Sequence, residues 1–309
     1  MSPKQLARVA MVLVALLLLW GAASLARRGS RGPSESDRFA LGVIPRDLVD
    51  SIIIQHPADT ARLGRVDSAT WTVNGHPAAR NAVQDILTAL ADTTRRTELV
   101  GGRSGSHAGF GVDSASATRT RVVRGDSTVA DLVQGHRGPG LAGGYFRLAG
   151  DSAVYLVEGN LAQALEQTSD ELRDKRIAGV SADSVARIEV TRGRRSYALQ
   201  RDGSTWKLTS GAHADSVAVA ELLSSYAQVD AAGFASRAQA DSAQFARPDR
   251  RVALLRADGS PLLRLVFDST ATGFWVRGGE DSTVYRLDNW SADRLTPSDS
   301  SFKAQPPRS

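Results

Sequence analysis

The sequence predicts an α+β protein, in which an N-terminal transmembrane helix precedes two tandem repeats of a mainly antiparallel sheet with packed helices. Three observations lead to this prediction. The chain has an uncharged apolar stretch near its start, an internal repeat with a period of about 135 residues, and short alternating apolar stretches that outnumber helical patterns. Short turns rather than helical crossovers join the expected strands, which favours antiparallel pairing.

The apolar stretch covers residues 9–26 and contains no charged side chain. A helix of this length spans about 27 Å, close to the ~30 Å of a bilayer core. Because a short tail ahead of such a span usually stays in the cytoplasm, we expect a single-pass anchor in the cell inner membrane with the body on the periplasmic side. The alternative is a signal peptide cleaved after Ala26, although Arg27 and Arg28 directly after that site disfavour cleavage.

The internal repeat rests on matched segments that keep their order along the chain. The matches are 49–54 with 185–190, 67–73 with 202–208, 110–111 with 245–246, 144–146 with 273–275, and 152–155 with 282–285. The predicted order of domains is therefore a cytoplasmic tail (1–8), the anchor (9–26), a linker (27–46), the first repeat (47–178), the second repeat (179–303) and a short tail (304–309).

Each repeat begins with three expected strands and a helix. The strands lie near 49–55, 61–66 and 70–73, and near 185–190, 196–201 and 205–208. A stripe of apolar residues with helical spacing follows, preceded by Asn81 or Asp215 as a plausible N-cap. The stripe residues are Val83, Ile86, Leu87 and Leu90 in the first copy, and Val219, Leu222, Leu223 and Tyr226 in the second.

Further strands are expected near 119–124 and 128–133, and near 251–256 and 262–267. Two more follow in each repeat, around the aromatic pairs and around Tyr155 or Tyr285. The glycine-rich segment 135–144 links two of these strands and lacks the Gly-Lys-Ser/Thr ending of a phosphate-binding loop. It is therefore interpreted as a hairpin loop.

Composition excludes several classes of function. The chain has 38 basic and 33 acidic residues, but five basic and no acidic residues lie within residues 1–31, so the body is neutral and nucleic acid is not an expected partner. There is no cysteine, which excludes a thiol nucleophile or a cysteine-ligated metal. The five histidines are scattered singly, and no catalytic motif is found, so we expect no enzyme activity, no metal and no cofactor.

Two groups of residues are candidates for binding. The first is a charged segment that could dock a partner. Its residues are Asp170, Glu171, Arg173, Asp174, Lys175 and Arg176. The alternative for this segment is a solvated, capped helix that joins the copies. The second group consists of aromatic residues that could form an exposed stacking platform, although recurrence in both copies favours core positions. Its residues are Tyr145, Phe146, Phe274 and Trp275.

The order of these features resembles a bacterial family known as domain of unknown function 4340. The resemblance is carried by Ile52, Ile54 and Trp71, by the segments 143–146 and 154–157, and by the charged segment 170–176. The resemblance implies a membrane-anchored, extracytoplasmic protein, often encoded beside ABC-type export systems related to gliding-motility transporters. No enzymatic activity is established for that family, so no catalytic residue carries over.

The expected function is that of a non-catalytic accessory or interaction protein, with the membrane and ABC transporter subunits as partners. One alternative is a module that binds cell-envelope glycan through the aromatic positions or through a groove between the two copies. The other alternative is an enzyme with a site between the two repeats.

Overall fold

The computed structural model describes residues 44–113, 115–141, 143–279 and 282–303. The predicted cytoplasmic tail, the anchor, most of the linker and the C-terminal tail lie outside these residues. Within the described residues, no helix is both long and apolar enough to cross a membrane.

The chain divides into two units. One contains the residues up to Thr70 together with 81–168, and the other contains 71–80 together with the residues from Ser169 onward. This division differs from the predicted boundary at 178/179. Backbone hydrogen bonds explain the difference, because the Ala79 N–H donates to the Leu172 carbonyl oxygen at 2.8 Å and the Asp174 N–H donates to the Pro77 carbonyl oxygen at 2.9 Å.

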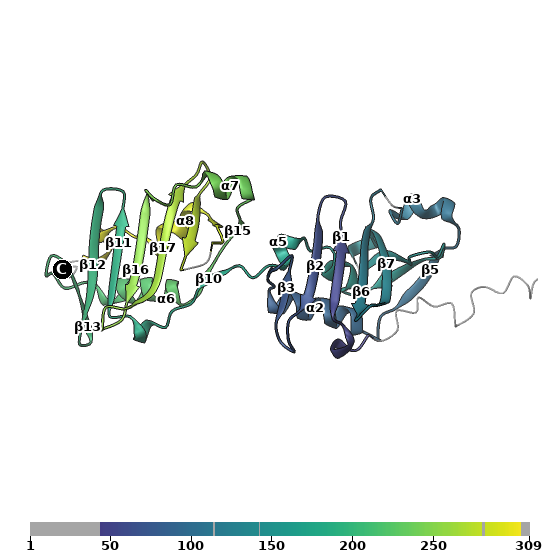
Figure 1. The fold of residues 1–309 in the computed structure, drawn as a ribbon, viewed down its shortest axis with the longest axis horizontal. Helices are drawn as coiled ribbons and strands as arrows, with labels where there is room; N and C mark the ends of the chain where they lie inside the picture. The colour runs from purple at the N-terminus through teal and green to yellow at the C-terminus, as the bar shows by residue number, and fades with distance from the viewer. Residues whose placement is uncertain (1–43, 114, 142, 280–281, 304–309) are drawn as a thin grey trace, which may run out of the picture. The chain divides into compact units, whose positions relative to one another are not determined.

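The first sheet has nine strands in the order β4-β3-β2-β1-β6-β7-β8-β9-β5 (Figure 1). Strand β1 pairs antiparallel with both β2 and β6. The strands are β1 (Ser51–Gln55), β2 (Thr60–Arg65), β3 (Trp71–Val73), β4 (His76–Pro77), β5 (Thr97–Gly101), β6 (Thr118–Arg124), β7 (Ser127–Arg137), β8 (Gly143–Leu148) and β9 (Val154–Glu158).

The second large sheet has eight strands in the order β13-β12-β11-β16-β17-β18-β19-β15. Its strands are β11 (Arg187–Arg192), β12 (Arg195–Asp202), β13 (Thr205–Leu208), β15 (Gly233–Phe234), β16 (Arg250–Leu255), β17 (Pro261–Ser269), β18 (Phe274–Gly278) and β19 (Tyr285–Leu287). A separate small sheet joins β10 (Arg176–Ala178) to β14 (Val229–Asp230).

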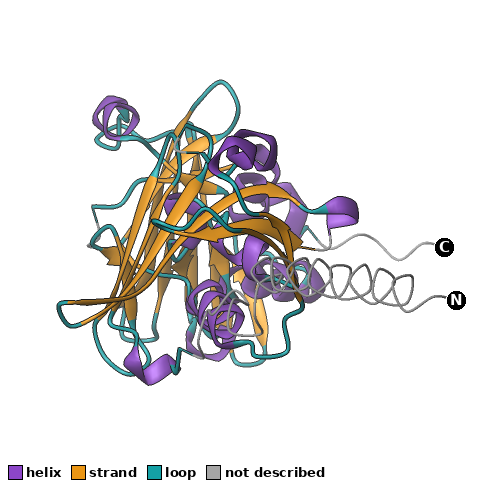
Figure 2. Ribbon diagram, turned by 90° about the vertical axis from the view of Figure 1, so that its right-hand side faces the viewer, coloured by secondary structure: helices purple, strands orange, loops and turns teal. Residues whose placement is uncertain are grey.

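Apart from β4, the two large sheets have the same strand order when read from β3 and from β13. The duplication in the sequence is thus a duplication of topology. The expected α+β class with mainly antiparallel sheets is confirmed for the described residues, and strands dominate over helices (Figure 2). The edge strands β5 and β15 were not predicted, and they occupy equivalent places beside β9 and β19.

The predicted long helices are present as α2 (Arg80–Ala91) and α6 (Ser216–Ala227), and every stripe residue in both is buried. Asp215 caps α6, since its Oδ1 accepts hydrogen bonds from the N–H groups of Val217 and Ala218 at 2.8 and 3.1 Å. The prediction that Asn81 caps α2 is wrong, because that helix already begins at Arg80.

The remaining helices are short. The α-helices are α3 (His107–Phe110), α4 (Leu161–Leu165), α5 (Ser169–Leu172), α7 (Arg237–Ser242) and α8 (Asn289–Leu295). The 3-10 helices are η2 (Arg46–Leu48), η3 (Ser104–Ser106), η4 (Pro139–Leu141), η5 (Ala182–Ser184) and η6 (Asp299–Phe302).

Strand register corrects the predicted match of 144–146 with 273–275 by one residue. Val133 pairs with Arg147, and Val266, its counterpart in the second repeat, pairs with Arg277. Counting back from these arginines makes Tyr145 equivalent to Trp275. A slip of one residue moves a side chain to the opposite face of a strand, so the correction decides which aromatic residues are buried.

The corrected register also makes Gly143 equivalent to Gly273, and both glycines have the same role. A Cβ atom at Gly143 would collide with the Val157 carbonyl oxygen, and one at Gly273 would collide with the Leu287 carbonyl oxygen. Each glycine therefore lets the backbone of one strand approach the next more closely than any side chain would allow.

We expect Gly273→Ala to destabilise the protein by about 3 kcal/mol, because the new methyl group can only be accommodated by moving a strand backbone. Gly102→Ala is the matched control, since a Cβ atom there meets nothing within 4 Å, and we expect a change of no more than about 1 kcal/mol. Urea unfolding of both variants measures the difference. Equal stability of the two would show that the β18–β19 approach is looser than described.

Candidate functional site

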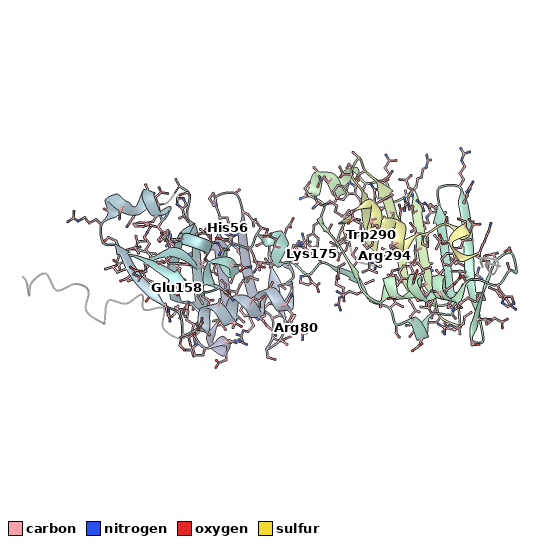
Figure 3. The ribbon with its side chains drawn as sticks, turned by 180° about the vertical axis from the view of Figure 1, so that it is seen from behind. His56, Arg80, Glu158, Lys175, Trp290 and Arg294 are labelled. Carbon is pink, nitrogen blue, oxygen red and sulfur yellow. The ribbon has the colours of Figure 1, made fainter. Side chains whose placement is uncertain are left out.

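The charged segment predicted to dock a partner consists of α5 and the residues that lead to β10, with Lys175 in the connection (Figure 3). Asp170, Glu171, Asp174 and Arg176 are exposed, whereas Arg173 and Lys175 are half-buried. Arg173 Nη1 lies 3.6 Å from Asp170 Oδ1, so its charge is partly matched within the segment. The charged side chains of α5 itself are the exposed carboxylates of Asp170 and Glu171.

Backbone contacts hold this segment in a defined place. Leu172 is fully buried, and its carbonyl oxygen accepts the hydrogen bond from Ala79 described above. Ala78 and Arg173 form an isolated antiparallel bridge. The buried leucine and the backbone bonds thus fix the position of the acidic side chains beside it.

The second repeat has the same closure, meaning a backbone bridge between the residues before its long helix and the segment at its end, but it lacks the acidic residues. Ala214 and Lys303 form the equivalent bridge, and the Asp215 N–H donates to the carbonyl oxygen of the buried Phe302 at 2.9 Å. The positions equivalent to Asp170 and Glu171 are Ser300 and Ser301. The closure belongs to the shared scaffold, whereas the acidic pair belongs to the first repeat alone.

The predicted exposed aromatic platform is corrected for two of its four members. Phe146 and Phe274 are buried in the cores of their repeats, because they lie on the inner faces of β8 and β18. Tyr145 and Trp275 are half-buried, and the Tyr145 ring packs against Phe110 with a centroid distance of 4.8 Å. These four residues do not form a continuous exposed surface.

The most exposed aromatic side chain among the described residues is Trp290 in α8, at 67%. The Arg294 guanidinium lies 4.9 Å from its ring centroid (Figure 3). Trp290 was not among the residues predicted to be exposed. The spacing of Ala292 and Leu295, both of which are buried, places Trp290 away from the apolar stripe of the helix and could have indicated its exposure.

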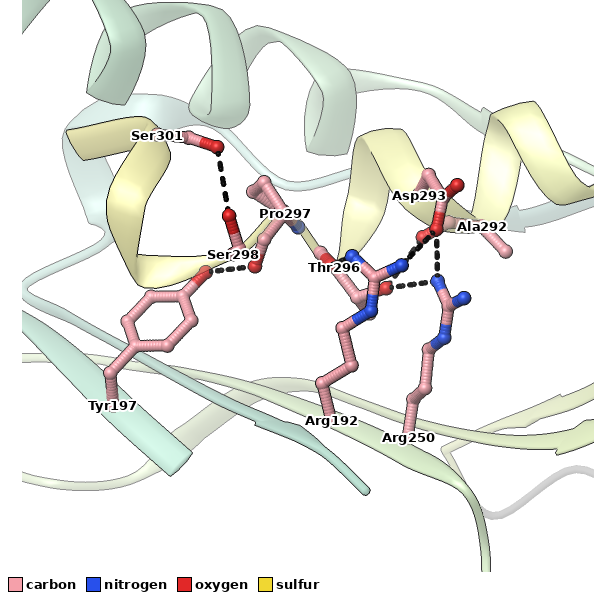
Figure 4. A network of polar contacts seen from close by, with 9 residues as sticks. All are labelled: Arg192, Tyr197, Arg250, Ala292, Asp293, Thr296, Pro297, Ser298 and Ser301. Carbon is pink, nitrogen blue, oxygen red and sulfur yellow. Dashed lines mark hydrogen bonds and ion pairs between the residues drawn. The ribbon is translucent and has the colours of Figure 1, made fainter. Parts of the chain in front are cut away.

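A network of arginines joins α8 to the ends of β11 and β16 (Figure 4). Asp293 Oδ1 accepts hydrogen bonds from Arg192 Nη2 and from Arg250 Nη1, both at 2.7 Å. Arg250 also donates to Thr296 Oγ1 at 2.8 Å, and its guanidinium lies 4.3 Å from the Phe274 ring centroid. One carboxylate and one aromatic ring thus compensate two closely spaced positive charges.

The first repeat makes the equivalent connection without arginine. His56 Nδ1 lies 3.0 Å from Thr118 Oγ1, and His56 Nε2 lies 3.0 Å from the Gln167 carbonyl oxygen. A single imidazole therefore joins the β1–β2 turn to the segment after α4. The second repeat uses two guanidinium groups for the same connection.

Each repeat has a cavity next to this connection. In the first, a cavity of about 660 Å³ lies between α2 and α4, with Thr88, Asn160, Gln163 and Gln167 among its lining residues. In the second, a cavity of about 690 Å³ is lined by the β11–β12 hairpin and by residues 297–299. No three histidine, aspartate or glutamate side chains of the described residues come together as a metal site requires.

We expect Arg250→Ala to destabilise the protein by about 2 kcal/mol, since the substitution removes three contacts of a side chain that is only 12% exposed. Arg187→Ala is the control, because Arg187 is 41% exposed and pairs only with groups at the surface; we expect a loss below about 1 kcal/mol. Thermal and urea unfolding would measure both. If the two losses were equal, the network would have no special structural role.

Comparison with models of known protein families identifies the family of this chain. The family described as Domain of unknown function (DUF4340) matches residues 71–248, from β3 of the first repeat into the second. No curated protein and no solved structure is similar enough to count as a match. Since the matched segment covers more than half of the 309 residues, this chain belongs to the DUF4340 family.

Proposed function

We propose that this protein is a non-catalytic accessory or interaction protein, anchored in the membrane through residues 9–26 and associated with an ABC-type export system. The acidic pair Asp170 and Glu171 carries the proposal, because the scaffold holds it in place and does not need it. The equivalent serines of the second repeat support the same closure. Both carboxylates are exposed beside a fixed backbone, where a partner can reach them.

The fixed backbone of α5 suits recognition of its two exposed carboxylates by basic side chains of a partner. Because Leu172 and the bonds to β4 fix the backbone, little conformational entropy is lost when a partner binds. Exposed charges contribute to the rate and specificity of association more than to folding stability. The export system is the proposed source of the partner, on the basis of the family resemblance and of the expected periplasmic location.

The test is affinity purification of the full chain from native membranes through a C-terminal tag, followed by mass spectrometry. We expect ABC transporter subunits to co-purify with the wild-type protein. The double variant Asp170→Lys, Glu171→Lys should reduce their recovery at least tenfold, because it reverses the charge that faces the partner.

The matched control is Glu221→Lys, Asp241→Lys, which makes the same change of charge at two exposed positions of the second repeat. We expect full recovery of the subunits with this variant. Failure of the wild-type protein to recover any transporter subunit, or equal losses with both variants, would contradict the proposal.

Glycan binding is the second candidate, and the exposure of Trp290 favours it. An indole that is 67% exposed, with an arginine beside it, is suited to stacking on a sugar ring. We expect cell-envelope polysaccharide to quench part of the tryptophan fluorescence of the wild-type protein, and Trp290→Ala to abolish that quenching. The same quenching in Trp290→Ala would rule out this residue as the contact.

A further inference from the structure

The β11–β12 hairpin concentrates three arginines around a turn of two residues. Arg192 ends β11, Gly193 and Arg194 form the turn, and Arg195 begins β12. Gly193 has φ +59°, which favours glycine, and its N–H donates to the Asp249 carbonyl oxygen at 2.8 Å. The turn is thus attached to the β16 side of the sheet, and the three arginine side chains leave from a fixed backbone.

These arginines line the cavity of about 690 Å³ together with Ser196, Ser298 and Asp299. Three arginines and one aspartate give the lining a formal charge of +2. The Tyr197 hydroxyl donates to the Pro297 carbonyl oxygen at 2.7 Å and so joins the hairpin wall to the opposite wall. Burial raises the pKa of Tyr197 well above its ordinary value, so this hydroxyl remains a donor.

The three arginines differ in what they contact. Arg192 is engaged by Asp293 and by the Thr296 carbonyl oxygen, at 2.7 and 3.3 Å. Arg194 and Arg195 are exposed, and within the described part of the chain neither guanidinium makes a hydrogen bond or an ion pair. Two guanidinium groups at the cavity are therefore available to a ligand.

The first repeat shows that the fold does not need these charges. In the register of the duplication, His56 corresponds to Arg192, Ala58 to Arg194 and Asp59 to Arg195. The Pro57–Ala58 turn is closed by a hydrogen bond from the His56 N–H to the Asp59 carbonyl oxygen at 2.8 Å. The same hairpin thus forms with no arginine.

We propose that this cavity binds the phosphate ester of a polyol, with the guanidinium groups of Arg194 and Arg195 on the phosphate and Asp299 on a hydroxyl group of the polyol. Guanidinium forks match the geometry of phosphate oxygens and bind them in a bidentate manner. The cavity is much larger than a bare phosphate and has the size of a small-molecule site. Asp299 repels a second anionic group but accepts a hydrogen bond from a hydroxyl, which selects a ligand that carries both groups.

Two sources can supply this chemistry, a soluble sugar or glycerol phosphate and the headgroup of a glycerophospholipid. Glycerol 3-phosphate represents the first, and glycerophosphoglycerol, the water-soluble headgroup of phosphatidylglycerol, represents the second. Calorimetric titration of the detergent-solubilised full chain with each probe distinguishes the sources. Tighter binding of the monoester would identify a soluble ligand, and tighter binding of the diester would identify a lipid headgroup.

The variant Arg194→Gln, Arg195→Gln should weaken binding of the preferred probe at least tenfold, and Arg194→Lys, Arg195→Lys should weaken it less because charge is retained. The control Arg237→Gln, Arg247→Gln removes the same charge at exposed positions of the same repeat and should bind as the wild-type protein does. Asp299→Ala should lose the preference of the wild-type protein for the ester over inorganic phosphate, because it removes the oxygen that accepts the hydrogen bond from the hydroxyl group.

Absence of saturable binding of both esters by the wild-type protein would overturn the proposal. Equal weakening by the glutamine variant and by its control would do the same, since binding would then follow net charge rather than the cavity. Equal affinity of the wild-type protein for inorganic phosphate and for both esters would overturn the assignment of a polyol.

Discussion

Burial of one apolar face of each sheet is the constraint on which the rest of this structure depends. In the second repeat, alternate residues of β11, β16 and β17 form a core with the buried stripe of α6 and with Phe302. Because side chains alternate along a strand, this burial fixes the register of every strand pair in the sheet. The same register then decides which residues remain outside the core and can bind a ligand.

The second consequence is that the two repeats serve as controls for each other. A feature that both repeats share is part of the common fold. Examples are the pair Gly143 and Gly273 and the buried pair Leu172 and Phe302. Where one repeat forms the same turn or bridge without a charged group that the other repeat carries, the fold does not require that group. By this criterion the acidic pair at 170–171 and the arginines at 194–195 are the features that most need a functional explanation.

Periodicity predicted the strands and the long helices well because these elements bury one face, and burial leaves a regular pattern. The edge strands β5 and β15 escaped prediction for the opposite reason. Strand β5 alternates poorly, with no buried residue, and β15 has only two residues. The predicted match of 144–146 with 273–275 was displaced by one residue, because adjacent aromatic residues look alike in the sequence whichever face of the strand they occupy. Strand pairing shows the face directly.

The cavity of the second repeat could not be predicted from sequence patterns, for a different reason. Its walls come from the β11–β12 hairpin and from residues 297–299, about a hundred positions apart, and no periodicity links them. The local run of Arg192, Gly193, Arg194 and Arg195 was visible in the sequence. The sequence alone does not show that the turn is held in place or that residues 297–299 lie opposite it, and both are needed to identify a binding site.

The acidic pair and the basic hairpin lie on different repeats of the sequence and have opposite charge, which gives the two proposals separate physical grounds. Exposed side chains interact weakly with the cores beneath them, so substitutions at either place should leave the scaffold intact. A protein that loses its transporter partner while still binding a phosphate ester would therefore show two independent uses of one duplicated fold, whereas loss of both functions from either substitution would show that the ligand and the partner are coupled.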